Sequence, residues 1–182
     1  FSACKNLTIC ARDNISYSIL KENFNNEILL VPDMAFCVNM KKWKRYPTTK
    51  DVLMLKRDDK EYKATTSIRH FESSLNTTVT DWPTFNEDCW QATWLRRTRK
   101  YLPFFYDWYA YAIFRPYLIN TGIKLIESHK MIYSTRLHAA ILSVLLGKAS
   151  DLVWLDNSYG KNRNFYEAWL KDCDGIQFLD GN

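Results

Sequence analysis

An arginine and a histidine lie two positions apart where a predicted strand passes into a predicted helix. The apolar run 131–133 ends at Ser134 and Thr135, and Arg136 and His138 follow directly. A guanidinium can bind a carboxylate or a phosphate through two parallel hydrogen bonds, and an imidazole can gain or lose a proton near neutral pH. The pair is therefore suited to holding an anionic substrate and moving a proton on it.

The helix expected after this pair would strengthen an anion site. Ser134 or Thr135 can cap it, and Gly147 marks its end. Its first N–H groups and the positive end of its dipole point at whatever lies above the strand. Residues two apart do not share a helix face, so Arg136 must lie in the turn and His138 in the first helical turn for both to reach one ligand. The structural alternative is that Arg136 pairs with a nearby carboxylate and His138 is a satisfied, semi-buried histidine.

A second arginine follows another predicted strand. Residues 7–11 predict a buried strand, Arg12 comes next, and Asp13 or Asn14 can cap the helix that follows. With a strand at 27–31, this unit has the length of one parallel crossover. Ligands of doubly wound sheets bind beyond the carboxyl ends of the strands, so Arg12 is a candidate ligand contact. An ion pair with Asp13 or another acid is the alternative.

A polar loop is expected after a third strand. The apolar residues 152–155 are followed by Asp-Asn-Ser-Tyr-Gly-Lys at 156–161, and Asn157, Ser158 and Lys161 can line a ligand at the same sheet edge. The loop lacks the glycine spacing of a phosphate-binding P-loop, so the sequence does not support nucleoside triphosphate binding.

The elements around these residues predict an α/β fold with a doubly wound, mainly parallel sheet, in one domain over residues 1–182. Within it, residues 85–130 form a helical, aromatic-rich segment. The other predicted strands and the last predicted helix lie at 51–55, 77–80, 176–179 and 164–172.

The segment 85–130 contains a basic cluster at 95–100 beside an aromatic stretch at 101–109. Such a segment suits a helix lying on an anionic bilayer. The alternative is that its rings pack against the sheet while the basic cluster faces water. The basic loop 41–50 is interpreted as a solvated loop, and no nucleic-acid partner is expected.

Composition indicates a globular chain. Apolar residues make up 47% of the 182 residues and aromatic residues 15%. No apolar run reaches the roughly 20 residues of a membrane span, no signal peptide is visible, and the chain opens on Phe1, which suggests part of a longer protein. Five cysteines without C-x-x-C spacing predict free thiols in a reducing compartment, hence the cytoplasm, and no metal site.

An ordered series of segments resembles one known family. The segments lie at 10–13, 30–35, 56–61, 81–84, 135–139, 146–148 and 156–161. Their order and spacing over nearly the whole chain resemble the carboxy-terminal half of the polysaccharide pyruvyl transferases. The resemblance implies a Rossmann-like domain, the second of two that face each other in a glycosyltransferase B architecture.

The same resemblance implies transfer of a pyruvyl group from phosphoenolpyruvate to sugar hydroxyls of a surface polysaccharide or exopolysaccharide, without a cofactor. Arg12 and Arg136 match arginines expected to hold the donor, and His138 matches the proposed catalytic histidine. The remaining expected site residues line the donor or acceptor edge: Asn157, Ser158 and Lys161. The expected partners are phosphoenolpyruvate, a saccharide acceptor that is free or lipid-linked, and the inner face of an anionic membrane. The sequence does not predict an oligomeric state.

Two other functions remain open. One is a nucleotide-sugar-dependent glycosyltransferase of the same architecture, in which the diphosphate of the donor would bind at the start of the same helix. A non-catalytic binding half could also have this sequence pattern, with the chemistry carried by a partner domain.

Overall fold

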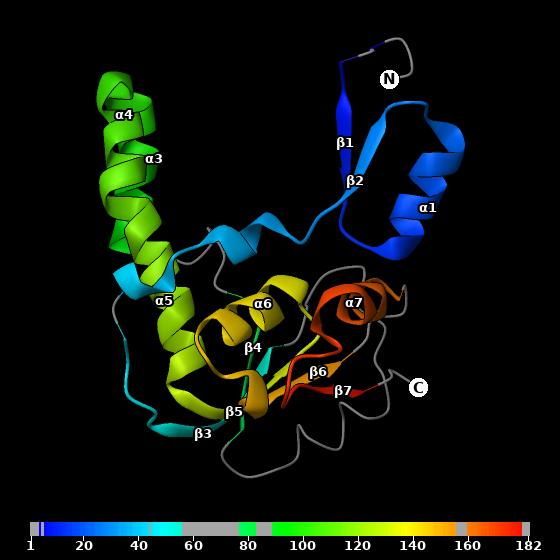
Figure 1. Cartoon of the computed structure of the whole chain (residues 1–182). Helices are drawn as coiled ribbons and strands as arrows, with labels where there is room; N and C mark the ends of the chain where they lie inside the picture. Colours follow the sequence, from blue (N-terminus) through cyan, green and yellow to red (C-terminus); the bar gives the residue numbers. More distant parts are fainter. Residues whose placement is uncertain are drawn as a thin grey trace.

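A parallel five-stranded sheet forms the body of the molecule, as shown by the computed structural model (Figure 1). The structure describes residues 4, 6–43, 45–55, 77–82, 89–155 and 160–179. The strand order is β4-β3-β5-β6-β7 and all four pairings are parallel. This confirms the predicted α/β fold. The strands are β3 (Lys50–Leu55), β4 (Thr77–Thr80), β5 (His129–Ser134), β6 (Leu152–Leu155) and β7 (Gln177–Leu179).

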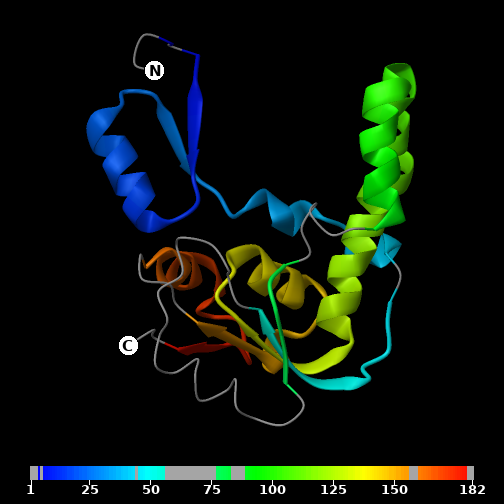
Figure 2. The same cartoon turned by 180° about the vertical axis from the view of Figure 1, so that it is seen from behind.

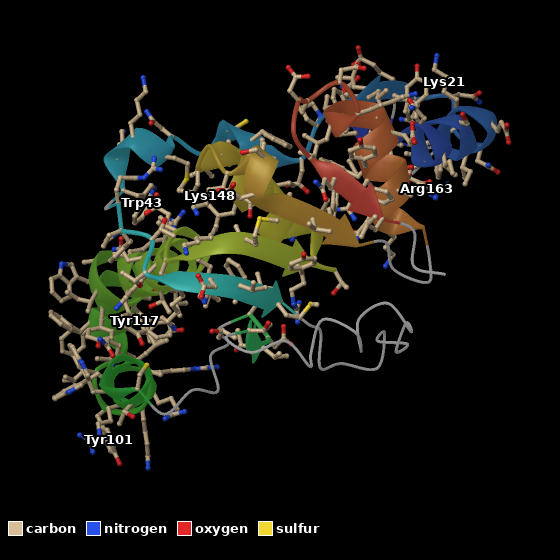
Figure 3. The ribbon with its side chains drawn as sticks, turned by 90° about the horizontal axis from the view of Figure 1, so that it is seen from below. Lys21, Trp43, Tyr101, Tyr117, Lys148 and Arg163 are labelled. Atoms are coloured by element: carbon tan, nitrogen blue, oxygen red, sulfur yellow. The ribbon has the colours of Figure 1, made fainter. Side chains whose placement is uncertain are left out.

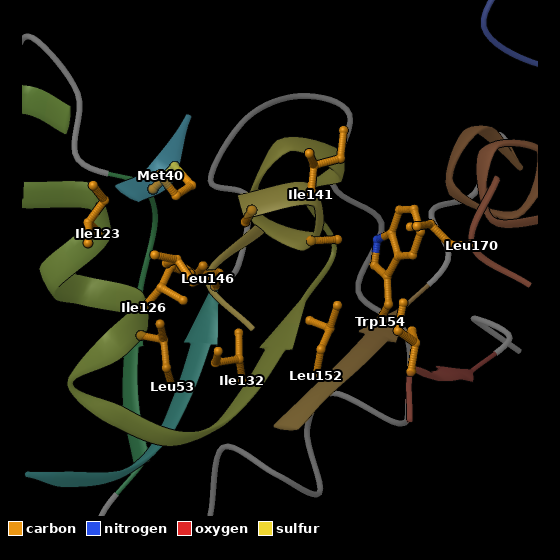
Figure 4. Packing of buried hydrophobic residues seen from close by; sticks show 14 of the residues in the cluster. Met40, Leu53, Ile123, Ile126, Ile132, Ile141, Leu146, Leu152, Trp154 and Leu170 are labelled. Carbon is orange, nitrogen blue, oxygen red and sulfur yellow. The ribbon is translucent and has the colours of Figure 1, made fainter. Parts of the chain in front are cut away.

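Three helices pack on one face of this sheet and enclose the main core (Figure 4). They are α5 (Arg115–Glu127), α6 (Leu137–Leu145) and α7 (Lys161–Phe165), and a π-helical turn η5 (Tyr166–Leu170) continues α7. The short 3-10 helix η4 (Ala149–Asp151) leads from α6 into β6. Apolar side chains of the strands meet those of the helices, and the buried contacts include Leu53, Ile123, Ile132, Ile141 and Trp154.

The N-terminal unit forms a sheet of its own. Strands β1 (Thr8–Ala11) and β2 (Glu27–Leu30) are parallel, joined by α1 (Asn14–Asn23), and they stand apart from the large sheet (Figures 1 and 2). Asp13 caps α1 as predicted, since its Oδ1 accepts the Ser16 amide at 2.8 Å. The crossover unit is therefore real, but it does not join the doubly wound sheet. The pattern of its residues fixes a strand–helix–strand unit, whereas its neighbours in space depend on tertiary packing.

A connector of two 3-10 helices leads from the small sheet to the large one. They are η1 (Met34–Cys37) and η2 (Met40–Lys42). Phe36 packs on the main core and stacks on Phe165 with ring centroids 6.3 Å apart, and Met40 is buried in the same core. This packing holds the start of the connector beside α6 and α7.

A helical hairpin projects from the sheet (Figures 1 and 2). It consists of α3 (Trp90–Tyr101), α4 (Pro103–Tyr109) and the π-helical turn η3 (Ala110–Phe114), which leads directly into α5. Pro103 at the first position of α4 suits a helix start, so the chain reverses at Leu102. In the part of the chain that the structure describes, no helix has the length and apolar character needed to cross a bilayer.

Two other predictions, on the cysteines and on the last helix, can be compared with the structure. All five cysteines are free thiols, which confirms that prediction. The last helix was expected to begin at 164, but α7 begins at Lys161, directly after Gly160, which has a left-handed φ of 65°. Gly160 supplies the sharp turn that an L side chain adopts at a cost, so the helix starts three residues early.

Candidate active site

Arg12 and His138 meet at one carboxylate. Arg12 Nη1 lies 3.4 Å from Asp33 Oδ2, and His138 Nε2 lies 3.6 Å from the same oxygen. The His138 side chain is 71% exposed, whereas that of Asp33 is 14% exposed. His138 is thus an accessible imidazole beside a guanidinium and a largely buried carboxylate, and it is not the semi-buried histidine of the structural alternative.

Three separate elements place this cluster. Arg12 follows the carboxyl end of β1, Asp33 precedes η1, and His138 is in the first turn of α6. Asp33 Oδ1 accepts the Ala35 amide at 3.0 Å, which leaves Oδ2 facing the Arg12 guanidinium and the His138 imidazole. The Trp169 indole donates to the Arg12 carbonyl oxygen at 2.8 Å and ties the small sheet to η5.

Arg136 forms a two-pronged ion pair. Its Nε lies 2.7 Å from Asp81 Oδ1 and its Nη2 lies 2.6 Å from Asp81 Oδ2. Each side chain is 25% exposed. The carboxylate partner expected under the structural alternative is therefore present, and it holds the guanidinium in a fixed plane at a partly solvated position. An anionic ligand at Arg136 would have to share the guanidinium with Asp81.

The sheet register explains why Asp81 and Arg136 come together. Thr80 at the end of β4 and Ser134 at the end of β5 both pair with Leu55 of β3. The residues that follow these two ends therefore leave the sheet at the same level, on either side of β3. The strand order also reverses here, because β4 lies on one side of β3 and β5, β6 and β7 on the other. Such a switch point is where doubly wound sheets bind their ligands.

The start of α6 differs from the prediction in its capping. Arg136 is the N-cap residue and makes no side-chain cap, so neither Ser134 nor Thr135 caps the helix. Ser134 Oγ instead accepts the Arg136 amide at 3.0 Å, because its side chain closes the tight turn between β5 and α6. The first N–H groups of α6 thus lack a capping side chain, a state in which a helix end favours an anion. The buried Thr135 hydroxyl has no hydrogen-bond partner among the described residues.

Of the three predicted loop residues, the structure describes only Lys161. Asn157 and Ser158 lie outside the described residues. Lys161 is described, and it is an exposed residue in the first turn of α7. Its neighbour Asn162 is buried and donates through Nδ2 to the Thr135 carbonyl oxygen at 2.9 Å. This bond holds the start of α7 against the turn that precedes α6.

Sequence reasoning missed Asp33, Asp81 and Asn162 as parts of this region. Asp81 directly follows β4, and Asp33 lies three residues beyond β2. The position after a strand was the signal used for Arg12, and it would also have identified Asp81. Nothing in the local pattern indicates that each carboxylate pairs with an arginine far away in the chain.

The chemistry of the cluster is that of an anion site. Among the described residues no three His, Cys, Asp or Glu side chains gather as metal ligands would. The arginines offer paired N–H donors for carboxylate or phosphate oxygens, and the exposed imidazole of His138 can take up or release a proton. These groups suit a small molecule with more than one negative charge that undergoes proton transfer.

The comparisons with known proteins agree on one family. The family model described as polysaccharide pyruvyl transferase matches residues 2–157. Pyruvyl transferase 1 of Schizosaccharomyces pombe is 29% identical over 186 residues, with 96% of this chain and 43% of that protein covered. EpsO of Bacillus subtilis, named as a candidate pyruvyl transferase, is 28% identical over 189 residues, with 98% of this chain and 55% of that protein covered.

Two further relatives extend the comparison. General stress protein 30 of Bacillus subtilis is 30% identical over 177 residues, with 97% of this chain and 46% of that protein covered. A crystal structure of a protein of uncharacterized function from Klebsiella pneumoniae has the same fold, with a TM-score of 0.57 and 22% identity over 93% of this chain and 54% of that one. The chain thus spans about half the length of the curated relatives it matches.

Proposed function

Because the chain belongs to the polysaccharide pyruvyl transferase family, we propose that it supplies the donor-binding half of an enzyme that transfers a pyruvyl group from phosphoenolpyruvate to a saccharide. In this proposal the chain is the second of two Rossmann-like domains, and the acceptor sugar lies between them. The reaction forms a pyruvate ketal on two sugar hydroxyls and releases phosphate, without a cofactor.

The convergence of Arg12 and His138 on Asp33 is the observation that carries the proposal. The two residues are far apart in the sequence, one after β1 of the small sheet and the other in α6, yet both lie within 3.6 Å of the same carboxylate oxygen. Arg136 precedes His138 by two residues at the start of α6. A donor with a carboxylate and a phosphate needs two separated cationic contacts, and Arg12 and Arg136 provide them.

The chemistry of ketal formation matches the side chains. One sugar hydroxyl adds to C2 of the enol phosphate while C3 gains a proton and becomes a methyl group. The C2–O bond to phosphate then breaks, and the second hydroxyl takes the place of the phosphate. Of the two hydroxyl protons, one ends on C3 and the other on the released phosphate.

In this scheme His138 moves protons, as general base toward the hydroxyl or general acid toward C3. A contribution of about 10²–10⁴-fold is typical of such a group. Asp33 orients the imidazole, and the uncapped start of α6 stabilises the departing phosphate. Lys161 is assigned to the donor or acceptor edge in this scheme, as are Asn157 and Ser158 on the sequence pattern alone.

The setting we propose is the cytoplasm, close to the membrane if the acceptor is lipid-linked. Five free thiols support a reducing compartment.

Donor binding by the 182-residue chain tests the assignment of the arginines. We expect phosphoenolpyruvate to bind with an affinity that falls at least tenfold in Arg12→Ala and in Arg136→Ala, the loss expected for one charge-assisted contact. Lys130→Ala is the matched control, because it removes an exposed cation at the opposite end of β5. Equal binding by all three variants would assign the donor site elsewhere, and preferential binding of a uridine or guanosine diphosphate sugar would favour a glycosyltransferase.

Turnover tests the assignment of His138. In the full-length protein, His138→Ala should lower the rate of pyruvylation by about 10²–10⁴-fold with little change in donor affinity. Wild-type turnover in this variant would remove His138 from the mechanism.

A further inference from the structure

The helical hairpin of α3 and α4 exposes an unusual number of aromatic rings. Phe104 is 83% exposed, Tyr101 66% and Trp90 62%. The rings point outward, and Tyr101 points away from the sheet (Figure 3). The large apolar residues exposed on this hairpin and the start of η3 are Trp90, Trp94, Tyr101, Leu102, Phe104, Phe105, Trp108 and Tyr111. The sequence-based alternative, in which the rings pack against the sheet, is therefore wrong for these residues.

The buried residues of the hairpin form a small core of their own. Ala92, Tyr109 and Phe114 pack together, and the helices α3 and α4 contact mainly each other and η3. The exposed rings are thus additional to what the hairpin needs to fold. A soluble protein seldom leaves so large an apolar surface in water without a use for it.

Some of the exposed rings line a shallow groove of about 370 Å³ between the helices of the hairpin, whereas Tyr101, Phe104 and Tyr111 lie outside it. Among its lining residues are Trp94, Leu102, Phe105 and Trp108. Its lining is almost wholly apolar, so hydrogen bonding would add little to the binding of an occupant. The groove suits acyl chains or apolar side chains.

The charge of the hairpin is strongly basic. Residues 89–115 contain five Lys and Arg residues against one acid, Asp107. The cations lie on the exposed rings: Arg97 is 5.7 Å from the centre of the Trp94 ring and Lys100 is 4.9 Å from that of Tyr101. No ion pair joins Arg97, Arg99 or Lys100 to a carboxylate within the described residues. Apolar rings and unneutralised cations therefore occupy the same surface.

We propose that the tip of this hairpin, residues 97–108, docks in the headgroup region of an anionic bilayer. Tyr and Trp rings prefer the boundary between headgroups and acyl chains, and Lys and Arg beside them keep their charges at the phosphates. A second copy of the chain is a poorer occupant, because it would bring like charges of two hairpins together. The proposal is independent of the proposed function and would place any activity of the chain at a membrane surface.

Vesicle binding by the 182-residue chain tests the proposal. Vesicles in which about one lipid in three is phosphatidylglycerol should bind the chain, pure phosphatidylcholine should bind it far less, and binding should fall as salt rises from about 0.05 to 0.5 M. Arg99→Ala combined with Lys100→Ala should weaken binding roughly 30-fold. The matched control is Lys21→Ala with Lys171→Ala, which removes the same charge from α1 and the end of η5.

A second pair of variants tests the contribution of the exposed apolar side chains to membrane binding. Phe104→Ser should weaken binding at least tenfold. Met34→Ser should not change it, although Met34 is 84% exposed, because it lies in the connector. Quenching of tryptophan fluorescence by brominated lipid should accompany binding, since Trp108 lies within the docking region.

Three results would overturn the proposal. They are absence of binding to anionic vesicles, equal binding of Phe104→Ser and Met34→Ser, and a chain dimer that Phe104→Ser dissociates without any vesicle binding. The last result would identify a second copy as the occupant. Circular dichroism and thermal unfolding should show that each variant is folded, because all substituted residues are exposed.

Discussion

The ion pair between Arg136 and Asp81 should contribute measurably to stability, and a double-mutant cycle can isolate its contribution. Arg136→Ala and Asp81→Ala each remove one partner, and the double variant removes both. The coupling free energy between the two substitutions then reports the pair itself, because effects that each substitution has alone cancel.

The expected magnitude follows from the geometry. Two guanidinium N–H groups reach two carboxylate oxygens at 2.7 and 2.6 Å, an arrangement stronger than a single contact. Pairs fully exposed to water contribute about 0–1 kcal/mol, and losing one partner of a buried pair costs about 3–5 kcal/mol. Both side chains are 25% exposed, so solvent screening places the coupling between these limits. We expect about 1–2 kcal/mol.

Urea denaturation of the four proteins, followed by circular dichroism, measures the unfolding free energies. The pair Lys130–Asp51 is the matched control. It joins β5 to β3 at 2.8 Å, but with side chains 68% and 48% exposed. Its coupling should be much smaller and should vanish at high salt. If the two cycles give the same coupling, the fixed pair at the sheet edge does not hold Arg136 in place.

The remaining predictions concern folding and pH. In Gly122→Ala the new Cβ would lie 2.8 Å from the Trp82 ring. We therefore expect the free energy of unfolding to fall by about 1 kcal/mol, although alanine favours helices more than glycine does. In a Trp82→Leu background the same substitution should no longer lower the free energy of unfolding. Burial lowers the pKa of His129 below its ordinary value of 6.5, so the native state disfavours its protonation. The unfolded chain then binds the proton more readily, and the free energy of unfolding should decline as pH falls below about 6.5, a slope that His129→Gln should reduce in urea titrations. Glu127→Gln should lower the free energy of unfolding by about 1–3 kcal/mol, as measured by chemical denaturation. The reason is that the buried Glu127 carboxylate accepts the Tyr46 amide at 2.6 Å and pairs with Arg45. An unchanged free energy of unfolding would contradict this prediction.

The strands and helices could be predicted because they depend on local pattern. The β-branched run at 77–80 and the apolar run at 152–155 are strands in the structure, and Asp13 caps its helix as its residue type indicates. The predicted cap of α6 was wrong. Two hydroxyl residues precede the helix, and in the tight turn Ser134 Oγ accepts the Arg136 amide instead of capping α6. The choice between such local bonds depends on backbone geometry that the sequence does not specify.

Features that join distant residues could not be predicted. Arg136 and Asp81 are brought together only by the register of β4, β3 and β5. Asp33 reaches His138 only because η1 packs beside α6. The exposure of the aromatic hairpin could not be predicted either, because an aromatic-rich stretch has the same composition whether it lies in a core or on a surface.

The small sheet of β1 and β2 has a consequence for how firmly Arg12 is held at the candidate active site. Two strands with four paired residues each hold little stability of their own, so this lobe can detach at a far lower free energy than the body. Arg12 belongs to the lobe and His138 to the body, and the indole of Trp169 is a latch between them. The Trp169 hydrogen bond and the shared contact with Asp33 therefore hold the Arg12 guanidinium near the His138 imidazole. Amide hydrogen exchange should register detachment of the lobe as faster exchange in β1 than in β5.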